Sequence, residues 1–128
     1  MKLLIDTHVF LWWIGDDPRL SEKAGRIISE ADNQLYLSAA SGWEIAIKAK
    51  LGKLQVDGDV TAFIIEHMRL NSIEQLPVSI AHSLHVSTLE DLHRDPFDRM
   101  LVAQARLERM PILTGDQYIA AYPVETIW

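Results

Sequence analysis

The stretch Leu3-Leu4-Ile5-Asp6-Thr7-His8-Val9-Phe10-Leu11-Trp12-Trp13-Ile14 decides the fold. Its first residues form a short apolar run that is typical of a buried strand, and the residues after Asp6 are apolar densely enough for a buried helix. A strand that passes through a polar turn into a helix is the beginning of a βα unit. The stretch therefore predicts an α/β protein whose first strand ends at Asp6.

The same alternation continues along the chain. Apolar runs predict further strands in residues 34–38, 72–78 and 111–114, and apolar periodicity predicts helices in residues 21–31, 39–54, 59–70, 79–89 and 97–109. The pair Asp95-Pro96 marks the start of the last helix, because Asp caps helices and Pro suits the first helical position. This pattern predicts a three-layer α/β/α sandwich with a short, mainly parallel sheet.

Length and composition indicate one domain over residues 1–128, since 48% hydrophobic and 23% charged residues are ordinary for a globular chain. The absence of Cys favours a reducing, cytoplasmic setting. No apolar run approaches the roughly 20 residues that span a bilayer, so no membrane helix is expected. Asp6 and His8 interrupt the apolar start, which therefore does not resemble a signal peptide.

Acidic side chains occupy positions where carboxylates are uncommon. Asp6 and Asp116 follow predicted strands, Asp98 lies at the start of a predicted helix, and Glu44 lies between Trp43 and an isoleucine. Each has an ordinary explanation as a helix cap, a first-turn acid or a solvated side chain. However, the ends of parallel strands meet at one edge of a sheet, and carboxylates in apolar surroundings need a partner.

Converging carboxylates repel one another unless a cation neutralises them. Without Cys or a paired His motif, the oxygen-rich set favours Mg²⁺, or else Mn²⁺, over Zn²⁺. Two such ions can activate water for phosphodiester hydrolysis. They would also offset four carboxylates, which reduces the formal net charge of -6 to an effective value of about -2 and weakens the objection that an acidic chain cannot bind nucleic acid.

Four motifs resemble those of a known family. They are Leu4-Ile5-Asp6-Thr7-His8, Trp43-Glu44-Ile45, His93-Arg94-Asp95-Pro96-Phe97-Asp98-Arg99 and Leu113-Thr114-Gly115-Asp116. In this order the motifs resemble the PIN-domain ribonucleases, specifically the VapC-type toxins of toxin-antitoxin pairs. The resemblance extends over nearly the whole chain.

The resemblance implies a Mg²⁺-dependent endoribonuclease that acts as a toxin. It implies that Asp6, Glu44, Asp98 and Asp116 are the catalytic residues and hold Mg²⁺ or Mn²⁺, with Thr114 as an auxiliary hydroxyl. The implied partners are an RNA substrate, a cognate antitoxin and a second copy of the chain.

Each of the other polar residues near the acids has two expected roles. Asp95 is either an outer metal ligand or the helix cap. His8 and His93 either contact RNA or a metal-bound water, or form local hydrogen bonds. Arg99 either orients phosphate or pairs with neighbouring acids, whereas the lysines of residues 48–53 are expected to be favourable end-of-helix charge.

Two other functions compete with the nuclease. A haloacid dehalogenase-like phosphohydrolase also starts with Asp after a first strand, but it needs a second Asp two positions later, where this chain has His8. A non-catalytic interaction module on the same fold is the other alternative. Trp12, Trp13 and Trp43 are expected to be mostly core, with one exposed edge as a possible anchor for the antitoxin.

Overall fold

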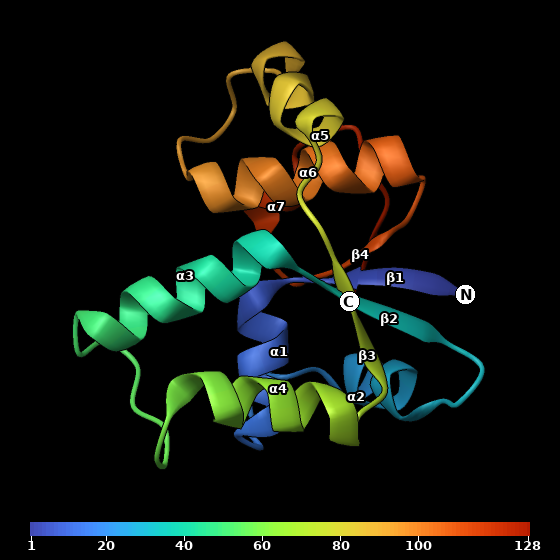
Figure 1. Cartoon of the computed structure of the whole chain (residues 1–128). Helices are drawn as coiled ribbons and strands as arrows, with labels where there is room; N and C mark the ends of the chain where they lie inside the picture. Colours follow the sequence, from blue (N-terminus) through green and yellow to red (C-terminus); the bar gives the residue numbers. More distant parts are fainter.

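Five parallel strands form one sheet at the centre of the computed structural model, which describes residues 1–128 (Figure 1). The strands are β1 (Lys2–Ile5), β2 (Gln34–Ser38), β3 (Ile73–Leu76), β4 (Ile112–Leu113) and β5 (Thr126–Ile127). Their order in the sheet is β3-β2-β1-β4-β5. The first strand of the chain, β1, is therefore the central strand of the sheet.

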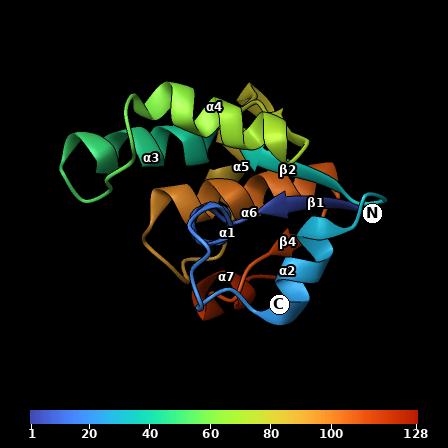
Figure 2. The same ribbon diagram turned by 90° about the horizontal axis from the view of Figure 1, so that it is seen from below.

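Helices connect the strands and lie on both sides of the sheet. They are α1 (Thr7–Ile14), α2 (Glu22–Ser29), α3 (Ala39–Lys50), α4 (Val60–Leu70), α5 (Ile80–His85), the 3₁₀ helix η1 (Val86–Thr88), α6 (Pro96–Glu108) and α7 (Gln117–Ala120). Figure 1 shows α5 and α6 above the sheet and α1, α2 and α4 below it, and Figure 2 shows the lower side directly. The expected α/β fold with helices on both faces is confirmed.

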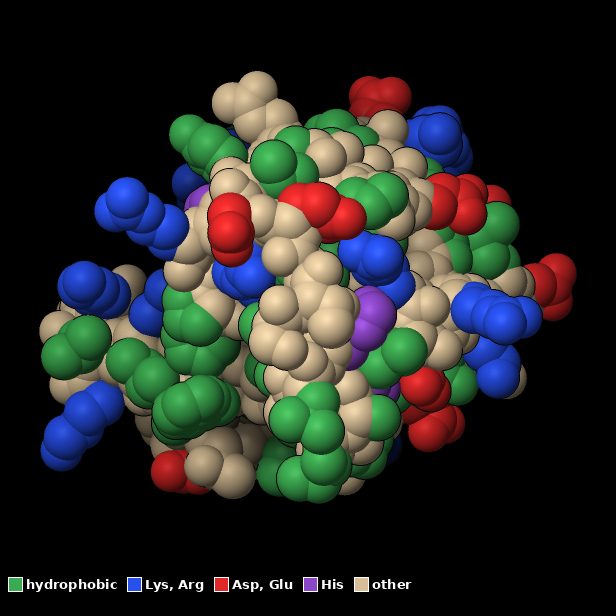
Figure 3. All heavy atoms as spheres, turned by 90° about the horizontal axis from the view of Figure 1, so that it is seen from above, with side chains coloured by type: hydrophobic (Ala, Val, Ile, Leu, Met, Phe, Trp, Pro, Cys, Tyr) green, Lys and Arg blue, Asp and Glu red, His purple; other side chains and the backbone are tan.

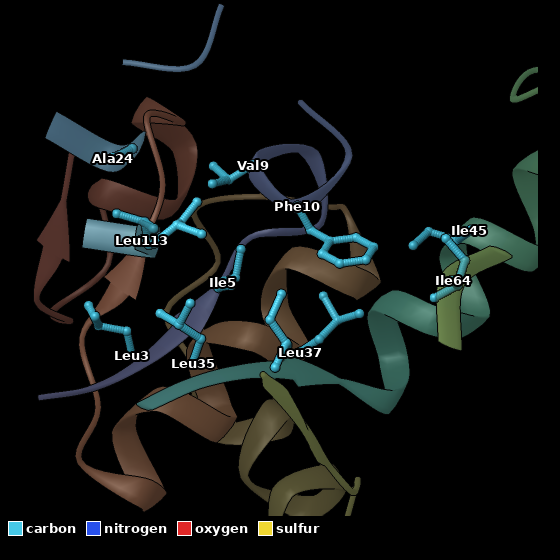
Figure 4. Packing of buried hydrophobic residues seen from close by; sticks show 12 residues of the cluster. Leu3, Ile5, Val9, Phe10, Ala24, Leu35, Leu37, Ile45, Ile64 and Leu113 are labelled. Carbon is cyan, nitrogen blue, oxygen red and sulfur yellow. The ribbon is translucent and has the colours of Figure 1, made fainter. Parts of the chain in front are cut away.

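The side chains of β1 alternate between two hydrophobic cores, as the period of a strand requires. Leu3 and Ile5 belong to the core that contains α1, α2 and α4, whereas Leu4 belongs to the core under α6. All three are fully buried. In the first core the ring of Phe10 points toward Ile45, so α3 is packed against α1 (Figure 4). One strand thus serves both layers, which explains why the opening stretch is so apolar.

The structure adds two elements that the sequence patterns do not predict. Helix α7 and strand β5 are too short to show a periodicity, and β5 gains its backbone partners only from β4. The helix predicted over residues 39–54 ends at Lys50, and the one predicted over residues 79–89 divides into α5 and η1. No helix combines the length and the apolar character that crossing a membrane requires.

The expectation that the tryptophans are mostly core is wrong for Trp43, whose side chain is 66% exposed. Its indole packs edge-on against the ring of Phe97, with centroids 5.4 Å apart. Trp12 and Trp13 are half-buried. Apolar neighbours in the sequence misled the expectation, because the residues beside Trp43 on a helix point to other faces.

Candidate active site

The Asp6 carboxylate lies where β1 ends and α1 begins, and only 3% of the residue is exposed. Its Oδ1 accepts a hydrogen bond from the backbone N–H of His8 at 3.0 Å, which caps α1. Its Oδ2 accepts one from the Thr114 hydroxyl at 2.7 Å. Pairing of Ile5 with Leu113 in adjacent parallel strands brings these two residues side by side. The sheet register therefore fixes the orientation of Asp6.

Asp116 is linked to Asp6 through the same hydroxyl. The backbone N–H of Asp116 donates to Thr114 Oγ1 at 3.0 Å, and the Asp116 carboxylate accepts from the backbone N–H of Tyr118 at 2.8 Å. Asp116 thus caps α7, as Asp6 caps α1. Two acids at the ends of neighbouring strands share one threonine.

Asp98 is the buried acid in the first turn of α6. Burial raises its pKa to about 6, and the charge of Asp95 adds to this, as do those of Asp6 and Asp116. A hydrogen bond of 2.9 Å between His93 Nε2 and Asp98 Oδ2 opposes the rise. The Asp98 carboxylate is therefore close enough to Asp6 and Asp116 to feel the charge of both.

Glu44 lies in α3 and is 4% exposed. Its Oε2 pairs with Lys48 Nζ at 2.9 Å, whereas its buried Oε1 has no hydrogen-bond partner. The same ammonium lies 3.3 Å from His8 Nε2, and His8 Nδ1 lies 3.7 Å from Asp6 Oδ1. The contact with Asp6 raises the pKa of His8, against the opposing effect of burial. Lys48 and His8 thus connect Glu44 to Asp6.

Asp95 caps α6, as one of its two expected roles requires, while its role as an outer metal ligand stays a prediction. Its Oδ1 accepts from the backbone N–H groups of Phe97 and Asp98, at 2.8 and 3.1 Å, so it caps α6. Its carboxylate also belongs with His93 and Asp98 to a group of possible metal ligands whose atoms lie within 4.8 Å of one another.

Arg99 does not form the expected ion pair, and its expected contact with phosphate stays a prediction. Its guanidinium donates to the backbone carbonyls of Val86, Glu90 and His93 and to the Tyr122 hydroxyl, at 3.0 to 3.3 Å. No carboxylate pairs with it, and the expected ion pair with a neighbouring acid is absent. Arg99 instead holds the segment between η1 and α6 against the helix.

Sequence patterns missed two contacts at the site. The His93 ring stacks on Tyr118, with centroids 4.9 Å apart and an interplanar angle of 9°. This contact joins residues distant in sequence, so no local signal could predict it. Lys48 was expected to be only end-of-helix charge, but its spacing of four residues from Glu44 is a signal for the observed pair.

The donor set fits a hard divalent cation. Asp98 lies near Asp6, Asp95 and Asp116, its pKa is raised, and one buried oxygen of Glu44 has no partner. A cation that prefers oxygen ligands would relieve the repulsion at Asp98, and the unpartnered Glu44 oxygen is a further available ligand.

Comparisons with known proteins give concordant results. The model of the PIN domain matches residues 3–125. The chain is 30% identical to a protein of Mycobacterium tuberculosis named ribonuclease VapC22, over 98% of both chains. It is also 38% identical over 72 residues to ribonuclease VapC16 of the same organism, which covers about half of each chain.

Solved structures support the same fold. The chain resembles a chain in the DNA-bound VapBC2 complex of Rickettsia felis, with a TM-score of 0.71, 12% identity and coverage of 99% and 98% of the two chains. It also resembles a chain in a toxin-antitoxin complex of Klebsiella pneumoniae, with a TM-score of 0.65, 16% identity and coverage of 98% and 96%. At these identities the likeness concerns the fold alone.

Proposed function

Because this chain belongs to the PIN-domain family, and within it to the VapC group, we propose that it is a metal-dependent endoribonuclease and the toxin of a toxin-antitoxin pair. A single domain over residues 1–128, working in the cytoplasm, would carry the activity. The observation that carries the proposal is the convergence of three acids: Asp6 at the end of β1, Asp98 in the first turn of α6 and Asp116 after β4. Full-length similarity to a protein named as a ribonuclease supports RNA as the substrate.

Asp6, Glu44, Asp98 and Asp116 would hold the cation, which we propose is Mg²⁺, with Mn²⁺ as a substitute. The oxygen-only donor set supports this choice. When bound, such an ion supplies Lewis acidity that eases deprotonation of water and offsets charge on the departing 3′ oxygen.

The chain's own residues prepare this set. The Thr114 hydroxyl fixes one oxygen of Asp6, and His93 fixes one oxygen of Asp98. Lys48 compensates the charge of Glu44 on one oxygen and leaves the other free. The carboxylates are thereby oriented before any cation binds, which reduces the reorganisation that binding requires.

An antitoxin and a second copy of the chain are the protein partners that we propose. The Rickettsia felis and Klebsiella pneumoniae structures that share the fold are described as a VapBC and a toxin-antitoxin complex. Helix α5 presents Ile80 and Leu84 with 76% and 67% of their surfaces exposed. Figure 3 looks onto this side of the molecule and shows hydrophobic side chains among charged ones. Exposed apolar side chains of this kind suit a protein interface.

No observation favours the alternatives. His8 stands where a haloacid dehalogenase-like phosphohydrolase needs its second Asp, and all four acids that an inactive interaction module could lose are present.

Cleavage of single-stranded RNA by the purified chain tests the proposal. We expect cleavage with Mg²⁺ or Mn²⁺, none with EDTA, and none by Asp98→Asn at the same metal concentration. Metal should also raise the melting temperature of the wild type, by a stabilisation of about 2.7 kcal/mol at a hundred times Kd. Full activity of the folded Asp98→Asn chain would contradict the assignment.

A further inference from the structure

A hollow of about 440 Å³ opens beside the acid cluster. Asp6 and Asp116 of the acid cluster line it, and its other lining residues are His8, Trp12, Arg19, Gly115 and Trp128. The hollow is therefore continuous with the site where we place phosphodiester cleavage, but most of its wall takes no part in holding the acids.

The aromatic walls are held in place. The Trp12 and Trp128 rings contact each other at a tilt of 60°, with centroids 6.0 Å apart. The Trp128 indole lies so close to Gly115 that a Cβ there would come within 2.5 Å of the ring. Glycine is therefore required next to Asp116 for the indole to reach this position.

Arg19 contacts both an indole and a carboxylate. Its guanidinium lies 5.0 Å from the centre of the Trp12 ring. The Asp17 carboxylate accepts hydrogen bonds from the Nε–H and from a terminal N–H of this guanidinium, at 3.1 and 2.7 Å. The guanidinium thus has a carboxylate partner and an aromatic neighbour before any ligand arrives.

These features favour a flat, uncharged ligand over a phosphate. The Arg19 guanidinium is already paired with Asp17, so a phosphate would have to compete with that carboxylate. Indole rings and guanidinium planes are the groups on which proteins stack unpaired bases. We propose that the hollow receives one unpaired nucleobase of the RNA strand, next to the phosphate that is cut. This inference rests on the proposed function.

Binding of fluorescein-labelled single-stranded RNA decamers tests the inference by anisotropy. The Asp98→Asn chain with Mg²⁺ binds without cutting, and an abasic nucleotide is placed at each position of the decamer in turn. We expect one position at which loss of the base weakens binding about tenfold. Adding Trp128→Leu should weaken binding of the intact decamer equally and abolish the effect of that abasic position. Trp128→Phe should restore both.

Two further variants control for structure. Trp43→Leu removes an indole outside the hollow and should leave the abasic effect intact. Trp12→Leu removes the neighbouring indole and serves as the test if Trp128→Leu lowers the melting temperature strongly. An abasic effect that persists in both Trp12→Leu and Trp128→Leu would overturn the inference, while RNA cleavage by the wild type would leave the proposed function standing. Failure of the wild type to cut and of Asp98→Asn to bind any RNA would overturn both.

Discussion

Thr114 donates its hydroxyl hydrogen to Asp6 Oδ2 at 2.7 Å and accepts the Asp116 backbone N–H at 3.0 Å. Because the hydroxyl has a single hydrogen, accepting from Asp116 leaves that hydrogen for Asp6. One buried side chain thus sets the positions of two acids. Thr114, expected only as an auxiliary hydroxyl, thus links the acids that follow β1 and β4.

Replacing Thr114 with Val keeps the shape of the side chain and removes the hydroxyl. Asp6 Oδ2 then loses its donor in a buried position, so we expect a loss of about 1–3 kcal/mol in the free energy of unfolding. Cleavage should fall more than tenfold because Asp6 is free to turn. Urea unfolding and initial rates measure the two effects. Thr114→Ser retains the hydroxyl and should restore most of both.

Asp98 makes the stability of the metal-free chain depend on pH. Its pKa is about 6 in the fold against 3.8 ordinarily, so between these values the native state holds a proton that the unfolded state has lost. Its destabilising effect is absent below about pH 4, grows as pH rises, and is complete above pH 6. In EDTA, Asp98→Asn should therefore melt higher than the wild type at pH 8, with a difference that vanishes near pH 4. Equal melting temperatures at pH 8 would contradict the raised pKa.

Lys48 is the counter-ion of Glu44, so Lys48→Met leaves a buried carboxylate uncompensated. We expect the metal-free chain to lose about 1–3 kcal/mol of stability, a value reduced by the partial exposure of Lys48. Mg²⁺ should then bind more tightly, because it also neutralises Glu44. Thermal melts across a Mg²⁺ titration report both changes. The exposed Lys50, changed to Met, is the matched control and should alter neither.

The Arg99→Lys variant distinguishes two roles of Arg99: support of the segment between η1 and α6, and binding of phosphate. A lysine cannot reach the three carbonyls and the Tyr122 hydroxyl together. The free energy of unfolding should therefore fall by about 1–3 kcal/mol, and the melting temperature should fall with it. The KM for RNA should stay within about twofold. Arg94→Lys, on an exposed neighbour, should change neither quantity. A large rise in KM at unchanged stability would instead assign phosphate binding to Arg99.

Local patterns predict the framework of the site well. An apolar run that ends in Asp predicts both the buried strand and the acid at its end, which is how Asp6 is found. Asp95-Pro96 predicts the start of α6 and therefore the place of Asp98 in its first turn. These features depend on residues within a few positions of each other, so a single sequence is sufficient.

Contacts between distant segments explain what the sequence does not reveal. The stacking of His93 on Tyr118 and the packing of Trp128 on Gly115 depend on how β4 and β5 join the sheet. The exposure of Trp43 likewise depends on which face of α3 is covered. No spacing along the chain determines these arrangements, because each is set by the tertiary packing.

The central strand β1 is synthesised long before its neighbour β4, which determines when the acid cluster can form. Asp6 leaves the ribosome early, but Thr114 and Asp116 follow only after more than a hundred residues. Since a domain acquires its packing as a unit, a nascent chain that stops before β4 cannot orient its acids. A cell that makes this protein is thus exposed to the complete acid cluster only when translation has passed the last motif.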